Sequence, residues 1–352
     1  AVRHVNQDLN DALAGQTFAR QADLDRTMLA LDGTPNKSRL GANALLSVSL
    51  AFARAVAAER GLPLYQHLAE MLNRQPALPR LTVNLFSGGK HAGGQVAIQD
   101  VLVVPVSART IDESLATVYA VYQSAADLAQ QKYGMRSLTA DEGGLAPPFP
   151  DVDTMLSDAV EAIERAGFAP GRDVALAVDV AASHFYRDGR YHLGDTALDG
   201  PAMVAQVLAW LDAYPIISVE DGLAEDDWDH WPQLCSGVKP GVLVLGDDLL
   251  CTNPVRIRRA IDTQAANALL LKVNQIGTLT EAGQAYQLAR NAGWHITISA
   301  RSGETEDNWL ADLAVGWAGD HIKIGSITQS ERLAKYNRLL QIEAAATLTI
   351  IS

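Results

Sequence analysis

Six short hydrophobic segments, each with polar or charged residues at its end, constrain the fold of this chain more than any other feature. The segments are 174–179, 216–220, 242–247, 268–277, 295–301 and 321–325. Each is short enough for a buried strand, and between them lie segments such as 278–292, whose apolar residues recur at helical spacing. This alternation of buried strands and amphipathic helices predicts repeated βα units.

In a closed parallel barrel the carboxyl ends of the strands open onto one face, where active sites lie. Six residues at these ends would then converge: Asp179, Glu220, Asp247, Lys272, Arg301 and Lys323. Three carboxylates provide the oxygen ligands that suit a hard divalent cation such as Mg²⁺. A lysine beside them could act as a general base, because nearby positive charge would lower its pKa. Any one residue could be an ordinary strand end or half of an ion pair, but that explanation is poor for all six.

Composition limits the possible partners. With 352 residues, 48% hydrophobic and 20% charged, the chain can form a barrel and a smaller domain. A net charge of −13 and a pI near 5.0 argue against binding to nucleic acid or an anionic membrane. The two cysteines, Cys235 and Cys251, suggest no disulfide framework. We expect no membrane-spanning helix, and a cytoplasmic location.

The first part of the chain is predicted to be helical over residues 1–13, 23–32, 41–60 and 64–72. Segment 41–60 is apolar on most faces, which predicts that it is buried. Residues 74–79 have the composition of a linker. We therefore place one domain at residues 1–78 and a barrel domain at 79–352.

Three features lie between this linker and the first of the six segments. A strand over 81–85 leads into the glycine-rich turn 87–94, which carries His91, and the apolar run 96–106 is interrupted by Gln99 and Asp100. A helix is predicted over 111–133, followed by a loop, 138–144, that contains Glu142.

Several motifs resemble those of one family, in its order and spacing. They are DEGG (141–144), GDDL (246–249), CTNP (251–254), LLLKVNQIG (269–277), SGETED (302–307) and SERLAKYN (330–337). Together they are similar to enolase over nearly the whole chain. The resemblance implies an α/β fold, a (β/α)8 TIM barrel with a smaller N-terminal α+β domain capping its mouth. Enolases carry a small sheet and a mobile loop before the first helix, which this sequence does not contain.

The resemblance also implies roles for individual residues. Lys272 would be the base and Glu142 the general acid, while Asp179, Glu220 and Asp247 would hold Mg²⁺. The residues around a small anionic phospho-carboxylate substrate would be His91, Gln99, Asp100, Arg301, Ser302 and Lys323.

Several positions depart from the family pattern. Ala300 stands where enolases have a histidine in Ser-His-Arg-Ser, and Asp100 is one methylene shorter than the usual glutamate. His184 replaces a glutamate, and we expect it to be structural. The nearest histidine, His295, cannot replace the missing one simply, because residues 295 and 300 of a strand face opposite sides.

The expected function is that of a lyase acting on 2-phosphoglycerate or a closely related phospho- or phosphono-carboxylate. Ala300 and Asp100 favour a changed substrate, as in a carboxyphosphonoenolpyruvate synthase-like paralogue. A non-catalytic binding protein with an enolase-like fold is the other alternative, but it predicts decay of the metal ligands, which are all present. We expect a homodimer or a higher homo-oligomer.

Overall fold

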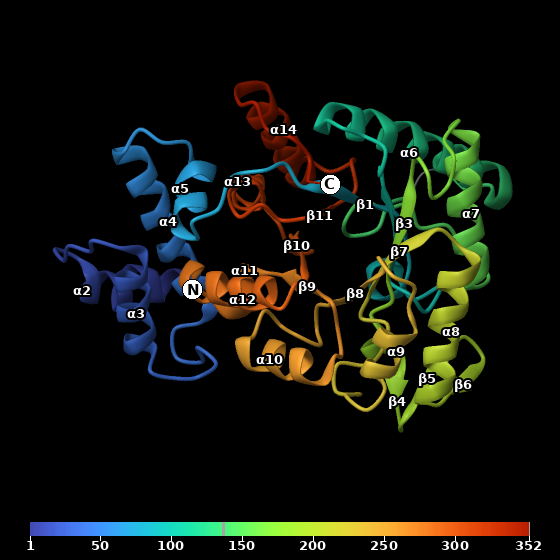
Figure 1. Cartoon of the computed structure of the whole chain (residues 1–352), viewed down its shortest axis with the longest axis horizontal. Coiled ribbons are helices and arrows are strands. Elements are labelled where there is room, and N and C mark those ends of the chain that lie inside the picture. The colour runs from blue at the N-terminus through green and yellow to red at the C-terminus, as the bar shows by residue number, and fades with distance from the viewer. Residues whose placement is uncertain (136–137, 352) are drawn as a thin grey trace.

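The computed structural model describes residues 1–135 and 138–351 and contains a helical N-terminal part beside a β-barrel (Figure 1). The N-terminal helices are α1 (Val2–His4), η1 (Val5–Leu9), α2 (Asn10–Leu13), α3 (Gln21–Asp32), α4 (Ala42–Glu59) and α5 (Leu64–Met71). Their bounds lie within two residues of the predicted ones. Within residues 1–78 as described, the only strand-like pairing is an isolated bridge from Leu78 to Ile350, so this part of the chain is helical.

The prediction that α4 is buried on most faces is wrong. Only 33% of the helix is buried, along the face that packs against α3 and α5 and includes Leu45 and Leu50. The opposite face carries Ala51, Ala55 and Ala58, small residues that are tolerated in contact with water. By length and composition alone α4 could cross a membrane, contrary to expectation, although one face of the helix packs against α3 and α5.

Eight strands close into a barrel in the order β1-β11-β10-β9-β8-β7-β3-β2. They are β1 (Arg80–Ser87), β2 (Asp100–Val104), β3 (Ala175–Asp179), β7 (Ile216–Glu220), β8 (Leu243–Gly246), β9 (Ala268–Leu271), β10 (His295–Ser299) and β11 (His321–Gly325). The predicted TIM barrel is confirmed. The expectation that all of its strands are parallel is wrong, because β2 runs antiparallel to both β1 and β3. Residues 88–99 join β1 to β2 without the long helical crossover that a parallel pair would need.

Helices cover the outside of the barrel, and several start where a side chain caps them. Asp151 Oδ1 accepts a hydrogen bond from Thr154 N at 2.7 Å, and Thr110 Oγ1 accepts one from Glu113 N at 3.0 Å. The helices are α6 (Ile111–Tyr133), α7 (Val152–Arg165), α8 (Gly200–Ala213), α9 (Trp231–Gly237), α10 (Pro254–Thr263), α11 (Val273–Ile276), α12 (Leu279–Asn291), α13 (Trp309–Gly316) and α14 (Ser330–Ala345). A small sheet of β4 (Tyr186–Arg187), β5 (Arg190–Leu193) and β6 (Thr196–Leu198) precedes α8.

The N-terminal helices pack on the side of the barrel formed by α11, α12 and α13 (Figure 1). The approach of α5 to α13 requires glycine at position 316, since a Cβ there would lie 2.4 Å from the Tyr65 carbonyl oxygen. Polar contacts fix the same interface, because Asp25 Oδ2 accepts a hydrogen bond from Thr280 N at 3.0 Å and Lys37 pairs with Glu281 at 2.6 Å. The helical part is therefore docked against the helices that follow β9 and β10.

Candidate active site

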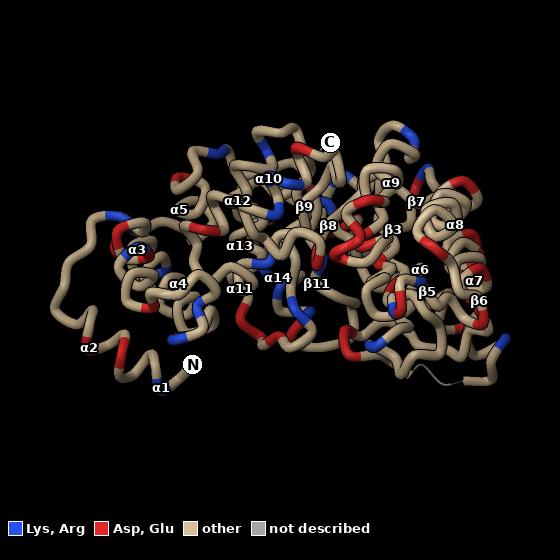
Figure 2. The backbone as a smooth tube through the Cα atoms, turned by 90° about the horizontal axis from the view of Figure 1, so that it is seen from below, with Lys and Arg blue, Asp and Glu red and all other residues tan. Residues whose placement is uncertain are grey.

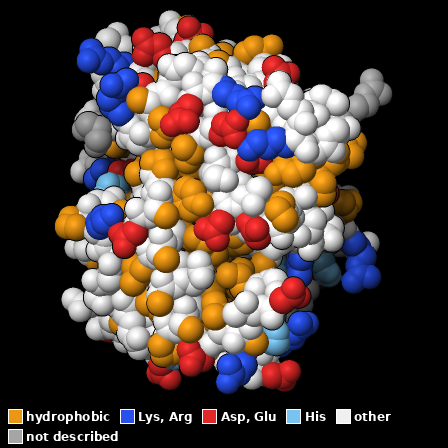
Figure 3. All heavy atoms as spheres, turned by 90° about the vertical axis from the view of Figure 1, so that its right-hand side faces the viewer, with side chains coloured by type: hydrophobic (Ala, Val, Ile, Leu, Met, Phe, Trp, Pro, Cys, Tyr) orange, Lys and Arg blue, Asp and Glu red, His pale blue; other side chains and the backbone are white. Residues whose placement is uncertain are grey.

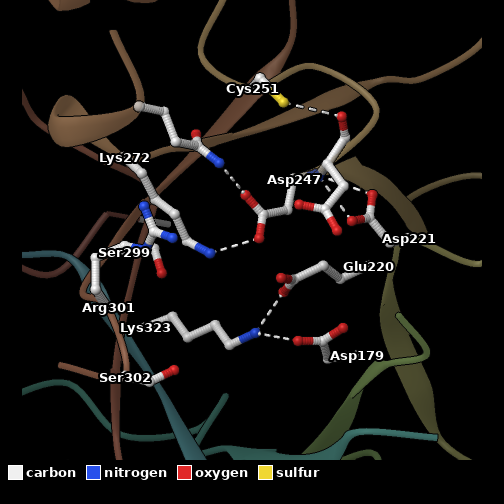
Figure 4. A network of polar contacts seen from close by, with 12 residues as sticks. Asp179, Glu220, Asp221, Asp247, Cys251, Lys272, Ser299, Arg301, Ser302 and Lys323 are labelled. Atoms are coloured by element: carbon white, nitrogen blue, oxygen red, sulfur yellow. Dashed lines mark hydrogen bonds and ion pairs between the residues drawn. The ribbon is translucent and has the colours of Figure 1, made fainter. Parts of the chain in front are cut away.

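Five of the predicted site residues meet in one buried mouth at the ends of parallel strands. Asp179 and Glu220 are the last residues of β3 and β7, Asp247 follows β8, Lys272 follows β9, and Lys323 lies in β11. Figure 4 shows their side chains pointing toward one another, and Figure 2 shows acidic residues gathered around β3, β7 and β8. The βα repeat thus brings together residues that are far apart in the sequence.

Two lysines hold the three carboxylates of the mouth. Lys323 Nζ donates hydrogen bonds to Asp179 Oδ2 and Glu220 Oε2, both at 2.7 Å. Lys272 Nζ donates to Asp247 Oδ2 at 2.5 Å, and the other oxygen of Asp247 accepts from Gln275 Nε2 at 2.8 Å. The mouth is therefore a network of charge-assisted bonds in which lysines and acids alternate.

Burial and neighbouring charges shift the pKa values of Lys272 and Glu220. Burial lowers the pKa of Lys272, but the carboxylates of Asp247 and Glu220 raise it more, so that it lies above the ordinary lysine value. The prediction of a lowered pKa is therefore wrong for the protein without a bound cation, although Lys323 does act in the predicted direction. Burial and the charge of Asp179 raise the pKa of Glu220 well above its usual range.

The acidic side chains of the mouth could hold a divalent cation. Glu220 Oε1 is buried and has no hydrogen-bond partner among the described residues, which leaves one carboxylate oxygen available. Oxygen-only ligands suit a hard cation. In this structure the ammonium groups of Lys272 and Lys323 supply the positive charge, so that Asp247 is drawn toward one lysine while Asp179 and Glu220 are drawn toward the other.

Two compact groups of three possible ligands, with atoms within 4.8 Å of one another, occur in and beside the mouth among the described residues, and neither is the predicted set of Asp179, Glu220 and Asp247. One group is His91, Asp100 and Glu142, and the other is Asp221, Asp247 and Asp248. The oxygens of Asp221 accept hydrogen bonds from the backbone N–H groups of Asp247 and Asp248 at 3.0 and 2.7 Å. We conclude that Asp221, which sequence reasoning missed, fixes the backbone that presents Asp247.

The antiparallel strand β2 begins at the mouth and brings Asp100 and Gln99 there. Gln99 Nε2 donates a hydrogen bond to Asp179 Oδ2 at 3.1 Å. The fully buried Asp100 accepts from Ser87 Oγ at 2.5 Å and lies 3.2 Å from His91 Nδ1. Burial lowers the pKa of His91, yet its bond to Asp100 raises that pKa above the ordinary value overall. Asp100 therefore orients His91.

Glu142 and Ser302 complete this side of the mouth. Glu142 Oε2 accepts a hydrogen bond from Asn84 Nδ2 at 3.1 Å, and Ser302 Oγ lies 3.4 Å from both Glu142 Oε1 and His91 Nε2. Arg301 is exposed and donates to Asn274 Oδ1 at 3.1 Å. The structure thus brings Glu142, Ser302 and His91 together, with Arg301 at the rim of the mouth.

Two buried cations on α14 hold the loop that carries Arg301 and Ser302. Arg332 donates to the carbonyl oxygens of Arg301 and Ser302 at 2.7 Å and of Ile324 at 2.9 Å. Lys335 donates to the Thr305 carbonyl oxygen at 2.6 Å and pairs with Glu304 at 3.0 Å. Arg332, Lys335 and Leu339 are spaced by three and four residues, so the spacing alone indicates that the two charged residues share a helix face with an apolar one that is buried.

We expect Arg332→Met to lower the free energy of unfolding by about 3–5 kcal/mol, because it leaves three carbonyl groups without their charged donor. Urea unfolding followed by circular dichroism measures this change. Arg187→Met, which removes an exposed arginine, serves as the control. A loss below about 1 kcal/mol would show that water replaces the guanidinium at these carbonyls.

The structure bears out the expectation that His295 does not replace the missing histidine at position 300. His295 begins β10 at the opposite end of the strand, is exposed, and lies 3.9 Å from Asp320. Ala300 is 6% exposed, and its N–H donates to the Lys323 carbonyl oxygen at 2.9 Å. The backbone at position 300 is therefore fixed beside the mouth, while its side chain provides no polar group.

The fold and this mouth define a TIM-barrel protein whose candidate active site is built from strand ends, as in the enzymes of this fold. Residues 1–68 match the model of the enolase N-terminal domain, and residues 75–349 match that of the enolase C-terminal TIM barrel domain. The chain therefore belongs to the enolase family, a family of lyase-type proteins.

Proposed function

We propose that this protein is a Mg²⁺-dependent lyase that reversibly dehydrates 2-phosphoglycerate to phosphoenolpyruvate, or acts in the same way on a close phospho- or phosphono-carboxylate. The observation that carries the proposal is the contact of Lys272 with Asp247 in a mouth that also contains Asp179, Glu220 and Lys323. A scaffold protein would have no need to bury so many charges together, because each is costly to remove from water.

In the proposed reaction, Lys272 Nζ accepts the proton from the carbon next to the substrate carboxylate. Glu142, held by Asn84, protonates the departing hydroxyl group. Lys323 stays charged, since Asp179 and Glu220 raise its pKa well above the usual value against the effect of burial. Arg301 suits the phosphate because its planar guanidinium can donate two parallel hydrogen bonds.

Asp179, Glu220 and Asp247 would hold Mg²⁺, which supplies positive charge to the substrate carboxylate as it becomes more negative, as is general for enolase-superfamily sites. A lysine can act as the base only if it loses its own proton first. The negative charges of Asp247 and Glu220 raise the pKa of Lys272. A cation bound to these carboxylates would offset their charge, and the pKa of Lys272 would then be lower.

The direct test is to supply the protein with 2-phosphoglycerate and Mg²⁺ and to measure the formation of phosphoenolpyruvate by its absorbance.

Ala300 and Asp100 support a reshaped substrate pocket. Ala300 offers no side-chain donor, and both carboxylate oxygens of Asp100 are already in contact with Ser87 and His91. A carboxyphosphonoenolpyruvate synthase-like activity is therefore the second candidate. If neither 2-phosphoglycerate nor its phosphono analogue is turned over, the lyase proposal fails.

We expect the natural protein to be slow with 2-phosphoglycerate and Ala300→His to raise kcat/KM about ten- to a hundredfold. The added imidazole would supply one charged hydrogen bond, worth about 1.5–3 kcal/mol, in a site that excludes water. Steady-state kinetics measure the change, and Ala51→His, on the exposed face of α4, is the control. Turnover by the natural protein at about 10 s⁻¹ or faster would show instead that 2-phosphoglycerate is its own substrate.

A further inference from the structure

Strand β1 contains a β-bulge at the point where it reaches the mouth. Its pairing with β2 shifts between Asn84 and Phe86, so that the ladder skips Leu85. Backbone bonds to another segment take over there, because Leu145 N donates to the Leu85 carbonyl oxygen at 2.8 Å. Ser87 N in turn donates to the Leu145 carbonyl oxygen at 2.8 Å. The loop that carries the proposed general acid is thereby attached to β1.

The bulge changes which side chains of β1 face the mouth. Residues 84 and 87 of a regular strand would point to opposite faces, because side chains alternate along a strand. Here Asn84 Nδ2 donates a hydrogen bond to Glu142 Oε2 at 3.1 Å. Ser87 Oγ donates one to Asp100 Oδ1 at 2.5 Å. Bulges re-aim side chains in this way beside active sites, and this one supplies a neutral donor to each of two acids.

The contact between the loop and β1 is close and requires glycine at position 144. A Cβ there would lie 2.4 Å from Ser87 Oγ and 3.5 Å from Asn84 Cβ. Both of these β1 side chains are fully buried. Close packing restricts rotation of the Asn84 amide, and it is the nitrogen of the amide that contacts the carboxyl group of Glu142.

Glu142 is a buried acid held by neutral groups. Acidic side chains on the face formed by α7 and α8 lie at the surface, where water solvates their charge (Figure 3). Glu142 is only 8% exposed, and its side-chain hydrogen bonds come from Asn84 Nδ2 and, at 3.4 Å, from Ser302 Oγ. A lysine or arginine in the place of Asn84 would favour the ionised carboxylate, whereas a general acid must carry a proton. A neutral amide orients the group without that effect.

We propose that Asn84 is a positioning residue that keeps the transferable proton of Glu142 on Oε1. The proposal rests on the function proposed above, in which Glu142 protonates the departing hydroxyl group. Oε2 accepts the hydrogen bond of the amide, so the proton is held by the other oxygen, which lies toward Ser302. As the bond from carbon to the hydroxyl oxygen breaks, its electron pair stays with that oxygen, which takes the proton from Oε1 and leaves as water.

Two substitutions at position 84 test this assignment with 2-phosphoglycerate and Mg²⁺. Asn84→Leu removes the donor at similar volume, and Asn84→Asp keeps the shape but replaces the donor with an acceptor. Each should lower kcat for dehydration about 10²-fold with KM nearly unchanged, the loss that a misplacement of about 1 Å can cause. Exchange of the α-proton with solvent deuterium should persist, because Lys272 is untouched. A merely structural role would reduce both rates together.

Asn291→Leu, at an exposed position at the end of α12, is the matched control and should change neither rate. The crystal structure of the Asn84→Leu protein gives a readout that needs no turnover, because the carboxyl group of Glu142 should move by about 1 Å or more. An unmoved Glu142, an unchanged rate of dehydration, or equal losses of dehydration and exchange would overturn the proposal. Movement of Glu142 in a protein that turns over neither candidate substrate would contradict the lyase function and support the placement of Glu142 by Asn84.

Discussion

Replacement of Lys272 by alanine is expected to abolish exchange of the substrate's α-proton with solvent deuterium and to lower turnover by about 10²–10⁴-fold. No other lysine in the described mouth is placed to take its role, because Lys323 is held between Asp179 and Glu220. Proton nuclear magnetic resonance of the substrate in deuterium oxide measures the exchange directly.

The same substitution should leave Mg²⁺ binding intact or strengthen it, since it releases Asp247 Oδ2 from the 2.5 Å contact with Lys272. Lys239→Ala, which removes an exposed lysine, is the control for the loss of one positive charge. If exchange persists in Lys272→Ala and only the stability falls, Lys272 is an ion-pair partner of Asp247 and another group is the base.

The barrel could be predicted from the sequence because burial on both faces leaves a simple pattern in parallel strands. Residues 175–178 and 268–271 are continuous apolar runs, and they lie in strands β3 and β9, whose residues are all buried. The rule that the carboxyl ends share one face then brings Asp179, Glu220 and Lys272 together without any knowledge of side-chain contacts.

The direction of β2 could not be predicted by the same pattern, because an apolar run carries no information about strand direction. In the antiparallel strand the mouth lies at the amino end, and this places Gln99 and Asp100 where a parallel strand would have placed residues near Val104. The site residues on β2 were identified by family resemblance, whereas the assumed barrel geometry was wrong for that strand.

The pairing of lysines with acids in the mouth also could not be predicted from the sequence. Residue types alone do not indicate that Lys323 contacts two acids while Lys272 contacts one, and these contacts decide the direction of the pKa shift of Lys272. Arg332 and Lys335 were overlooked for a related reason. Charged residues on a helix are ordinarily exposed, and these two are fully buried because carbonyl groups of the loop 301–305 and of Ile324 lie close enough to accept their hydrogen bonds.

Removal of a proposed metal ligand is the second large effect that we expect. Asp247→Ala should weaken Mg²⁺ binding by about 100-fold or more, because losing a direct ligand costs at least as much as the roughly 10- to 100-fold loss caused by altering a group behind it. Isothermal titration of the metal-free protein measures the affinity. Asp229→Ala, which removes an exposed acid outside the mouth, should leave the affinity unchanged.

The pH dependence of Mg²⁺ binding gives the same prediction a second readout. Because burial and Asp179 raise the pKa of Glu220 well above the value of 4.5 for an ordinary glutamate, its folded form retains a proton to higher pH than its unfolded form. The resulting contribution to the stability of the metal-free protein is present below about pH 4.5 and is lost as the pH rises through the folded pKa. Mg²⁺ requires the charged carboxylate, so its affinity should rise over that window and its binding should release protons.

Titrations in two buffers with different heats of ionisation measure this release, and Glu220→Gln should reduce it. Glu225→Gln, a change of the same type at a residue outside the mouth, is the matched control. If Mg²⁺ binds elsewhere, its affinity should be the same in the Asp247→Ala and Glu220→Gln proteins as in the natural protein. That result would exclude these carboxylates as ligands, because a negative charge close to a divalent cation contributes directly to its binding.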